Sequence, residues 1–522
     1  MPETGSGIVL VGMPTSGKST VGRLVAERLG RAFVDTDDLM AHRLGMPVPV
    51  YLEQHGELAL RAAEATAVAE ACEVSGAVIA TGGGAALDPL NRWALWHHGT
   101  VTWLNVASDE LLQRLRADAV PRPTLEPYGA ERLAAVLAER APVYRAADFR
   151  LDSPGSPEAV ADHLIAELRP VHGRRLLDAE VDRHHPIGPQ LTRVVMGVDV
   201  ADEAPAGVAV MDQRLVEAAP DLVHALQSNA CLPVRAGERA KRLRSLEVIL
   251  EWLAAERVER DTPLIAIGGG TIGDLAGTAA SLYARGLPLV HVPTTWLAQA
   301  DSSIGGKVAV DLSGAKNAVG AFWPPVAVIS DVAALRSLPV RLRRDGMAES
   351  IKAAIIGDPT LWRLLEDRGR QALRTDEAAR YAILERSARL KLRVCERDPF
   401  EAGERRTLNL GHTIGHGLEI ESGYQLPHGA AVALGMRAVA AIAAGRGARP
   451  EFAPRLDALL VRLGFKIGRS FDAAAVKSAM LGDKKRRAGR QRWILPMDVG
   501  RVIEVDGVSD AELELALRTI AA

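Results

Sequence analysis

Cysteine is scarce in this chain of 522 residues, which contains only three. Cys72, Cys231 and Cys395 lie far apart and form no CxxC pair. This pattern argues against a disulfide framework and against a zinc site built from thiolates. We therefore expect a protein of the reducing cytoplasm.

Net charge and long apolar runs are also lacking. The 63 basic residues nearly balance the 65 acidic ones, so nothing favours a nucleic acid or an anionic membrane, and small molecules are the expected partners. The longest apolar stretch, residues 429–445, contains Arg437 and is shorter than the roughly 20 residues that span a bilayer. No basic stretch precedes the first apolar run, so we expect no signal peptide.

The composition that is present, 48% hydrophobic and 25% charged, is that of a globular protein with roughly three to five domains. Strand-like runs alternate with helical patterns in residues 1–170, which predicts βαβ units on a parallel sheet. Residues 171–192 are polar and are predicted to be a linker. A second, Rossmann-like α/β pattern fills residues 193–330, and residues 331–522 show a nearly all-helical pattern. The predicted fold class is a multidomain α/β protein.

A phosphate-binding loop follows the first strand-like run. Residues 12–19 read GMPTSGKS, which satisfies GxxxxGK[ST] between an apolar run and a helical pattern. In such a loop, backbone N–H groups point at phosphate, the lysine reaches the terminal phosphates and the last hydroxyl can hold Mg²⁺. The candidates for binding ATP are Gly12, Thr15, Ser16, Gly17, Lys18, Ser19 and Thr20.

Further motifs in this half concern the acceptor of the phosphoryl group. They are Asp35 and Asp37 after a strand-like run, Arg61 and Glu64 on a helical pattern after Gly56-Glu57, Gly82 to Gly84, Arg122-Pro123, and Arg140 to Tyr144. With the phosphate loop, this set resembles shikimate kinase over about residues 6–170. The resemblance implies ATP-dependent phosphorylation of shikimate.

The same resemblance implies a role for each residue. Ser19 and Asp35 would hold Mg²⁺, Asp37 would bind the acceptor hydroxyls and take a proton, Arg61, Gly83 and Arg140 would bind the acceptor carboxylate, and Arg122 would lie on a lid over ATP. Planar guanidinium groups bind a carboxylate bidentately, so two arginines select a small acidic acceptor. A kinase of another small alcohol is the competing hypothesis.

The first candidate binding motif of the second half is a glycine-rich turn. Residues 264–274 read LIAIGGGTIGD, with Gly268, Gly270 and Gly273 spaced as in a dinucleotide-binding turn between a strand and a helix. The acidic residue expected about 20 positions on is missing. We therefore do not expect an ordinary dehydrogenase unit.

Histidines and one glutamate predict a metal site. His412 and His416 are spaced to share one helical face, His428 follows, and Glu349 is a carboxylate candidate. Two imidazoles and a carboxylate are typical of an open catalytic Zn²⁺ site. Spacing alone favours His412 and His416 as joint ligands, and a structural histidine pair is the competing interpretation.

The order of motifs in this half resembles 3-dehydroquinate synthase over about residues 193–522. The motifs are Gly237-Glu238 with Lys241, GGGTIGD, Pro293 to Thr295, Asp301 to Ser303, Gly305 to Lys307, Lys316-Asn317, Glu349 with Lys352, Lys391, Arg405 with Asn409, the three histidines, and Asp483 to Lys485. The resemblance implies that 3-deoxy-arabino-heptulosonate 7-phosphate is cyclised to 3-dehydroquinate with loss of phosphate. NAD would take a hydride and return it within each turnover.

This resemblance also implies the site residues. The divalent metal, Zn or Co, would be held by Glu349, His412 and His428, which leaves His416 in the site but off the metal. NAD would lie near Asp212, Glu238, Lys241, Gly269, Gly270, Asp274, Thr294, Thr295, Asp301, Ser302, Lys307, Lys316 and Asn317. The substrate would meet Asp301, Lys307, Asn317, Lys352, Lys391, Glu401, Arg405, Asn409, His416 and Lys484. The catalytic candidates are Lys18 and Asp37 in the first half and Lys307, Lys352, Lys391, Arg405, Asn409 and His416 in the second.

Two positions depart from the second family's pattern. Ala430 stands where a glutamate usually follows His428-Gly429, and residues 398–401 read DPFE in place of a more charged run. Loss of the glutamate is expected to loosen the support of the metal, since partners of metal ligands fix their orientation. We expect activity to tolerate both changes.

The two motif series together predict a bifunctional enzyme of aromatic amino acid biosynthesis. Its two steps are not consecutive in that pathway, so co-regulation is the simpler reason for the fusion. The resemblance implies a homodimer through the second half. Two competing hypotheses are a metal-dependent alcohol dehydrogenase in the second half and a catalytically inactive module in either half.

Overall fold

The computed structural model describes residues 7–118, 125–126, 129–152, 155–169, 171, 173–185, 188–226, 228–312, 315–481, 486–487 and 490–522. The chain divides into two compact units. The first comprises residues 1–180 with 194–200, and the second comprises residues 181–193 with 201–522.

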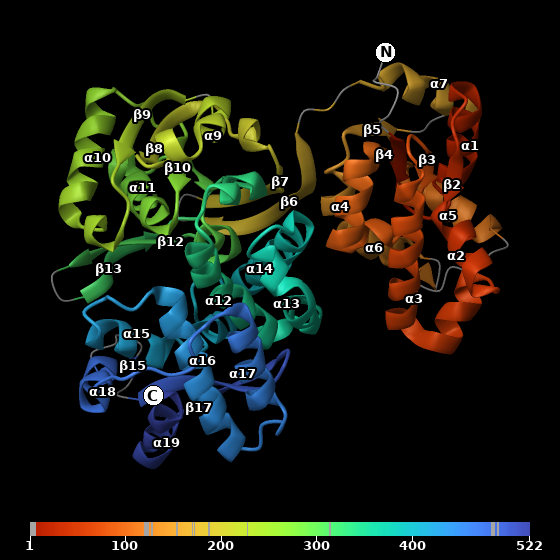
Figure 1. The fold of residues 1–522 in the computed structure, drawn as a ribbon. Coiled ribbons are helices and arrows are strands. Elements are labelled where there is room, and N and C mark those ends of the chain that lie inside the picture. Colours follow the sequence, from red (N-terminus) through yellow and green to blue (C-terminus); the bar gives the residue numbers. More distant parts are fainter. Residues whose placement is uncertain are drawn as a thin grey trace. The chain divides into compact units, whose positions relative to one another are not determined.

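The first unit is built on a five-stranded parallel sheet with strand order β2-β3-β1-β4-β5 (Figure 1). The strands are β1 (Gly7–Val11), β2 (Phe33–Asp35), β3 (Val78–Ala80), β4 (Gly99–Asn105) and β5 (Phe149–Asp152). The helices are α1 (Lys18–Leu29), α2 (Thr36–Leu44), α3 (Val48–Glu73), α4 (Pro89–His98), α5 (Ser108–Ala117), α6 (Ala130–Tyr144) and α7 (Pro157–Glu167). All five residues of β1 are buried, as expected of a central parallel strand covered on both faces. The predicted parallel sheet is confirmed.

A seven-stranded sheet with order β6-β7-β14-β11-β10-β8-β9 forms the α/β part of the second half. Its strands are β6 (Arg174–His185), β7 (Gly188–Val198), β8 (Gly207–Asp212), β9 (Ser228–Val234), β10 (Leu264–Gly268), β11 (Leu289–Pro293) and β14 (Ala327–Asp331). The pairs from β14 through β9 are parallel. Helices α8 (Leu215–Ala218), α9 (Pro220–Ala225), α10 (Leu243–Ala255) and α11 (Gly270–Leu282) complete this part. The Rossmann-like expectation is confirmed.

The predicted linker is wrong over most of its length, because residues 174–185 form strand β6 and β7 begins at residue 188. Leu176, Leu177, Asp178, Ala179 and Val181 are buried, and Glu180 and Asp182 are exposed. The buried run is short and charged residues surround it, so the segment looks polar when only helical periodicity is considered.

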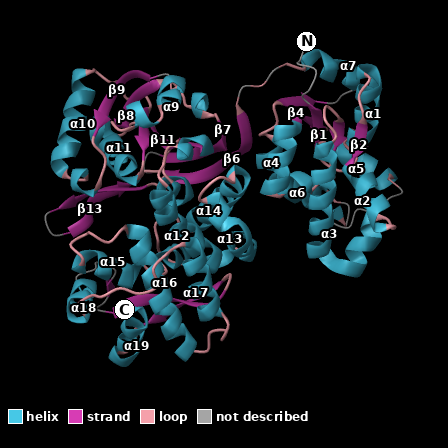
Figure 2. Ribbon diagram, in the orientation of Figure 1, coloured by secondary structure: helices cyan, strands magenta, loops and turns pink. Residues whose placement is uncertain are grey.

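The remainder of the second unit is rich in helices, with two small antiparallel sheets (Figure 2). The helices are α12 (Val340–Gly357), α13 (Pro359–Ala372), α14 (Glu377–Arg397), α15 (His412–Glu421), α16 (His428–Gly445), α17 (Phe452–Leu463), α18 (Ala473–Leu481) and α19 (Asp510–Ile520). The strands are β12 (Lys307–Leu312) with β13 (Ala315–Phe322), and β15 (Arg486–Arg487) with β16 (Arg490–Asp498) and β17 (Arg501–Asp506). The α-rich character predicted from the sequence is confirmed.

Helix α16 is the one described helix that is long and apolar enough to cross a membrane by length and composition. Of its apolar window, 67% is buried inside the structure. The helix packs against α12, α15 and α19. These contacts are those of a helix in the core of the unit.

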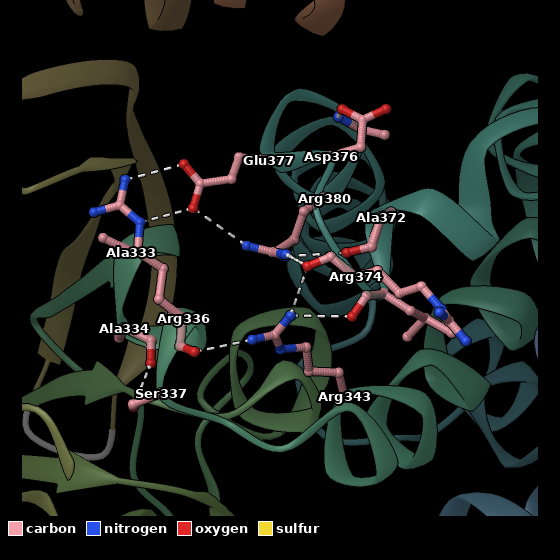
Figure 3. A network of polar contacts seen from close by, with 12 residues as sticks. Ala333, Ala334, Arg336, Ser337, Arg343, Ala372, Arg374, Asp376, Glu377 and Arg380 are labelled. Carbon is pink, nitrogen blue, oxygen red and sulfur yellow. Dashed lines mark hydrogen bonds and ion pairs between the residues drawn. The ribbon is translucent and has the colours of Figure 1, made fainter.

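A network of arginines joins α12 to the turn between α13 and α14 (Figure 3). Arg343 Nη1 donates to the carbonyl oxygens of Leu373 at 3.0 Å and Arg374 at 3.1 Å. Arg380 Nη2 donates to the same Arg374 oxygen at 3.1 Å, and its Nη1 lies 3.4 Å from Glu377. Arg343 and Arg380 are buried, and the bond from Arg343 to the Leu373 carbonyl oxygen is buried as well, so water cannot easily replace this donor. The network therefore fixes α12 against α14, and both helices carry side chains of the second candidate site.

Replacing Arg343 with methionine should destabilise the second unit. The change removes donors to Leu373, Arg374 and Arg336 and leaves the buried Leu373 carbonyl oxygen without this donor, while Arg374 keeps its bond from Arg380, at a cost of about 2 to 4 kcal/mol in the free energy of unfolding. Calorimetry of the full chain measures the effect. Arg341→Met, at an exposed position on the same helix, is the control. Equal effects of the two substitutions would contradict a role for the network.

Candidate active sites

The phosphate loop connects β1 to α1 in a conformation that needs its glycines. Gly12 and Gly17 have φ angles of 151° and 93°, and a Cβ on Gly12 would lie 2.7 Å from the Leu104 carbonyl oxygen. Lys18 Nζ donates to the carbonyl oxygens of Gly12 at 3.1 Å and Met13 at 2.8 Å. The loop therefore holds the Lys18 ammonium group beside the N-terminus of α1. Both the ammonium group and the helix N-terminus favour an anion at this place.

Ser19 and Asp35 meet beside this loop. The Ser19 hydroxyl donates to Asp35 Oδ2 at 2.6 Å, and Asp35 Oδ1 accepts the backbone N–H of Asp37 at 3.0 Å. Asp35 thus caps α2 and also faces the hydroxyl that begins α1. The pair supplies the oxygen ligands that Mg²⁺ prefers.

Three glycines after β3 bring the acceptor residues together. A Cβ on Gly82 would lie 2.5 Å from Asp37 Oδ1, one on Gly83 would lie 2.9 Å from Arg140 Nη1, and one on Gly84 would lie 2.6 Å from Arg61 Nη1. The side chains predicted for the acceptor thus line one turn that has no side chains of its own. The absence of Cβ atoms lets these three side chains approach the backbone of the turn closely.

A buried carboxylate, Glu64, lies among these cations, and the sequence motif that contains it predicts no role for it. Glu64 lies 2.7 Å from Arg61, and its burial raises its pKa. Arg140 is also buried, and its Nε has no hydrogen-bond partner among the described residues. Tyr144 donates its hydroxyl to the Gly83 carbonyl oxygen at 2.9 Å. The site therefore keeps donor capacity on a buried guanidinium, which suits an anionic acceptor.

The predicted lid residue Arg122 lies outside the described residues. Another arginine reaches the phosphate loop: Arg114 Nη1 donates to the Thr15 carbonyl oxygen at 3.2 Å. Thr15 has a φ angle of 63°, an uncommon conformation for a residue with a side chain. Arg114 and Arg140, whose Nη1 lies 4.0 Å from Met13 Sδ, are thus described arginines at the loop.

In the second unit, the glycine turn after β10 begins α11. A Cβ on Gly269 would lie 3.0 Å from Thr295 Cγ2, and one on Gly270 would lie 3.0 Å from Ser302 Oγ. The Thr294 N–H donates to the Gly268 carbonyl oxygen at 3.0 Å. Residues predicted to bind NAD therefore gather at the carboxyl ends of the parallel strands, where dinucleotides bind in such folds.

Charged residues predicted for the cofactor form pairs nearby. Lys241 lies 2.5 Å from Asp274 and also donates to Asn317. Burial raises the pKa of Asp274, and Lys241 opposes the shift. Asp212, at the end of β8, is paired with Arg214 at 2.6 Å. These polar groups stay compensated in the absence of a ligand.

A carboxylate and two imidazoles from three helices of the second unit lie close together. Glu349 Oε1 of α12 lies 3.5 Å from His412 Nε2 of α15 and 3.1 Å from His428 Nε2 of α16. Their ligand atoms all lie within 4.8 Å of one another, as do those of His416, Glu419 and His428. Among the described residues, no such group contains both His412 and His416, the pair that spacing alone favours. The first set matches the nitrogen and oxygen ligands of a catalytic zinc site.

Cations surround this cluster, and each lysine faces a carboxylate. Lys352 lies 2.5 Å from Glu349, Lys307 lies 2.6 Å from Glu401, and Lys391 pairs with Asp301. Burial alone raises the pKa of Glu349, but Lys352 and His428 outweigh it and hold that pKa below its usual range. The three lysines, Asp301 and Glu401 line a pocket of about 490 Å³ together with His412, His416 and His428.

Arg405 is held differently from the lysines. Its Nη1 donates to the Pro399 carbonyl oxygen at 2.5 Å and its Nη2 to that of Gly305 at 2.8 Å. Among the described residues, no carboxylate forms an ion pair with Arg405. Asp398, at the start of the DPFE run, accepts the backbone N–H groups of Gly403 at 2.6 Å and Arg405 at 3.0 Å. The loop thus presents a fixed guanidinium whose charge is open to an anion.

The last position of that run also contacts the pocket. Glu401 has a φ angle of 60° and accepts from Asn409 Nδ2 at 2.8 Å as well as from Lys307. The substrate candidate Lys484 lies outside the described residues. The other substrate candidates line the pocket of about 490 Å³.

Known proteins match both halves of the chain. Family models match residues 14–169 as shikimate kinase, 231–345 as 3-dehydroquinate synthase N-terminal and 346–486 as 3-dehydroquinate synthase C-terminal. A 3-dehydroquinate synthase of Xanthomonas campestris pv. campestris is 40% identical over 338 residues, which are 62% of this chain and 90% of that protein. The chain belongs to the 3-dehydroquinate synthase family. It is an enzyme that carries a shikimate kinase domain ahead of the synthase.

Two other relatives have related names. A 2-epi-valiolone synthase of Actinosynnema mirum is 40% identical over 291 residues, which are 54% of this chain and 76% of that protein. The solved structure of a 2-epi-5-epi-valiolone synthase from Streptomyces hygroscopicus, with NAD⁺ and Zn²⁺ bound, is 27% identical with a TM-score of 0.59. It covers 63% of this chain and 96% of that one. The synthase fold therefore occurs in proteins with different products.

Two carboxylates of the synthase unit were missed in the sequence. Glu419 Oε1 lies 2.7 Å from His428 Nδ1, and Asp345 Oδ1 accepts the backbone N–H of Gly429 at 2.8 Å. Burial raises the pKa of Glu419, but His428 outweighs it and lowers that pKa to about 2. The i+3 spacing from His416 to Glu419 was a usable signal, whereas Asp345 is far from His428 in the sequence. The site thus has carboxylates near His428 although residue 430 is alanine.

A buried histidine lies beneath the glycine turn of the synthase. A Cβ on Gly273 would lie 3.1 Å from His291 Cε1, and the ring is buried in the sheet. Burial lowers the pKa of His291 to about 4. The imidazole is therefore neutral in the folded protein at neutral pH.

The stability of the synthase unit should fall in mild acid because of His291. Its pKa is about 4 when folded and near the ordinary 6.5 when unfolded, so between these values the unfolded chain binds more protons. Stability is therefore lost as pH falls from about 6.5 to about 4, by up to about 3 kcal/mol. Denaturant unfolding across this range should show a shallower loss for His291→Leu than for the original chain. Parallel curves would contradict the assignment.

Proposed function

We propose that the first unit transfers the γ-phosphoryl group of ATP to the 3-hydroxyl of shikimate. Lys18 and the loop N–H groups bind the phosphates, and Ser19 with Asp35 holds Mg²⁺. Asp37 orients the attacking hydroxyl and accepts its proton, while Arg61 and Arg140 bind the carboxylate. The observation that carries this proposal is the approach of all three side chains to the same glycine turn.

Arg61→Ala should weaken binding of the acceptor far more than binding of ATP. Loss of a charge-assisted pair is worth about 1.5 to 3 kcal/mol, so KM for shikimate should rise about 10- to 100-fold with a small change in KM for ATP. Steady-state kinetics at varied concentrations of each substrate measure both. Arg28→Ala, on α1 with its partner Asp162, is a control outside the acceptor turn. Equal increases in both KM values would contradict the carboxylate role.

We propose that the second unit converts 3-deoxy-arabino-heptulosonate 7-phosphate into 3-dehydroquinate. Glu349, His412 and His428 would hold a divalent metal, Zn or Co, and the glycine turn would hold NAD. When bound, NAD supplies a hydride acceptor that is regenerated, and the metal favours loss of a proton from the hydroxyl to be oxidised. The observation that carries the proposal is the convergence of that ligand set with Lys307, Lys352, Lys391 and Arg405 in one pocket.

The balance of charge in the pocket favours a substrate with both a carboxylate and a phosphate. The cations Lys307, Lys352, Lys391 and Arg405 line the pocket together with the carboxylates Asp274, Asp301 and Glu401. Glu349 contacts Lys352, so four cations are balanced by four carboxylates, and a divalent metal would add two positive charges. A phosphate carries about 1.5 to 2 negative charges at pH 7 and a carboxylate one more. Arg405, which forms no ion pair with a carboxylate in the described part of the chain, is the proposed site for one of these anionic groups.

A cyclase whose substrate lacks the carboxylate is the second candidate, motivated by the relative named 2-epi-valiolone synthase. The two candidates differ in a direct assay of phosphate release. We expect the heptulosonate phosphate to be turned over with kcat/KM at least about 100-fold above that of a heptulose 7-phosphate without the carboxylate, since burying an unpaired cation costs several kcal/mol. The reverse preference would favour the second candidate.

Following NADH in the same reaction distinguishes the synthase from an alcohol dehydrogenase and from an inactive module. The synthase should show no net NADH at steady state, whereas an alcohol dehydrogenase should accumulate NADH with simple alcohols. An inactive synthase module would show neither phosphate release nor NADH, while Lys18→Ala would still abolish the kinase reaction. We further propose a cytoplasmic enzyme that forms homodimers through the synthase unit.

A further inference from the structure

Glu419 faces the imidazole of His428 from the side opposite to Glu349. Glu419 Oε1 lies 2.7 Å from His428 Nδ1, and Glu349 Oε1 lies 3.1 Å from His428 Nε2. Glu419 is 3% exposed. Each ring nitrogen therefore has its own carboxylate, and the Glu419 contact lies in a place that water hardly reaches.

Lys316 holds the other oxygen of Glu419. Its Nζ lies 3.2 Å from Glu419 Oε2, 2.9 Å from Glu238 Oε1 and 4.6 Å from the centroid of the Tyr424 ring. Lys316 belongs to β13, so this cation comes from outside the helices that carry the metal candidates. A buried carboxylate needs such compensation to stay charged and directed.

A different carboxylate satisfies the first turn of α16. Asp345 Oδ1 accepts the N–H groups of Gly429 at 2.8 Å and Ala430 at 3.3 Å. The side chain of Ala430 can accept a hydrogen bond neither from the first turn of α16 nor from His428 Nδ1. Capping of the helix and contact with His428 Nδ1 are therefore divided between Asp345 of α12 and Glu419 of α15.

We propose that Glu419 is a positioning residue that orients His428 for metal binding, with Lys316 as its support. In this role Glu419 accepts a hydrogen bond from Nδ1–H, so that Nε2 is the ring nitrogen left to bind a metal together with Glu349. Imidazoles that bind metals commonly donate their other N–H to a carboxylate, which fixes the tautomer and the ring orientation. The inference rests on the metal site of the proposed synthase function.

The test is the zinc affinity of the metal-stripped full chain, measured by competition with a chromophoric chelator and without any turnover. Glu419→Gln should weaken zinc binding about 10- to 100-fold, the usual effect of losing such a partner. Saturating zinc should restore most of kcat, because Glu419 acts through His428. Glu421→Gln, two residues along the same helix and paired with Arg469 at 3.2 Å, should keep the original affinity.

Lys316 gives a second, independent measurement. Lys316→Met should weaken zinc binding in the same direction but less than Glu419→Gln. The double variant should bind zinc no more weakly than Glu419→Gln alone, because Lys316 acts through the same carboxylate. Additive losses would overturn the support role of Lys316.

Glu419→Asp keeps the charge but shortens the reach to Nδ1, so it should give an intermediate loss of affinity. The kinase activity of each variant chain reports the quality of the preparation. The proposal is overturned if zinc affinity is unchanged in both the Gln and Asp variants. It is also overturned if two zinc ions bind per chain, since Glu419 would then be a ligand with His416. Expected affinities with no synthase turnover would contradict the reaction but not the positioning role.

Discussion

The buried carboxylate of Glu349 is the constraint on which the synthase unit depends. It lies on α12 and faces Lys352 from its own helix, His412 from α15 and His428 from α16. A buried charge is tolerated only when its partners are in place, so three helices must meet at fixed distances. The arginine network between α12 and the turn before α14 adds further fixed contacts to α12 (Figure 3).

Close approach to backbone is the second constraint, and it recurs in both units. Gly82 to Gly84 bring Asp37, Arg140 and Arg61 against one turn, and the glycine turn after β10 brings Thr295 and Ser302 against another. At each position a Cβ would lie about 3 Å or less from a predicted ligand-binding side chain. Small anionic ligands can therefore meet backbone N–H groups and cations together.

The near-neutral charge of the chain conceals how strongly its sites favour anions. Arg140 is buried with an unused Nε among the described residues, and Arg405 is buried against carbonyl oxygens. Each lysine in the synthase pocket is compensated by a carboxylate, so these sites are stable without a ligand. Arg140 and Arg405 are therefore buried cations of the two sites to which these contacts give little carboxylate compensation among the described residues.

Local features of this protein were determined by the sequence itself. The phosphate loop, the glycine turns and the strands that precede them depend on residues that are neighbours in the chain, so their patterns predicted them.

Tertiary structure decided the rest. Glu349 reaches His428 across 79 positions, Asp345 caps α16, and Glu419 rather than residue 430 faces Nδ1. The strand at residues 174–185 was missed because its few apolar residues lie among charged ones, and only pairing within the sheet makes the segment a strand. Spacing along one helix paired His412 with His416, but the distances between helices decide which side chains share an ion.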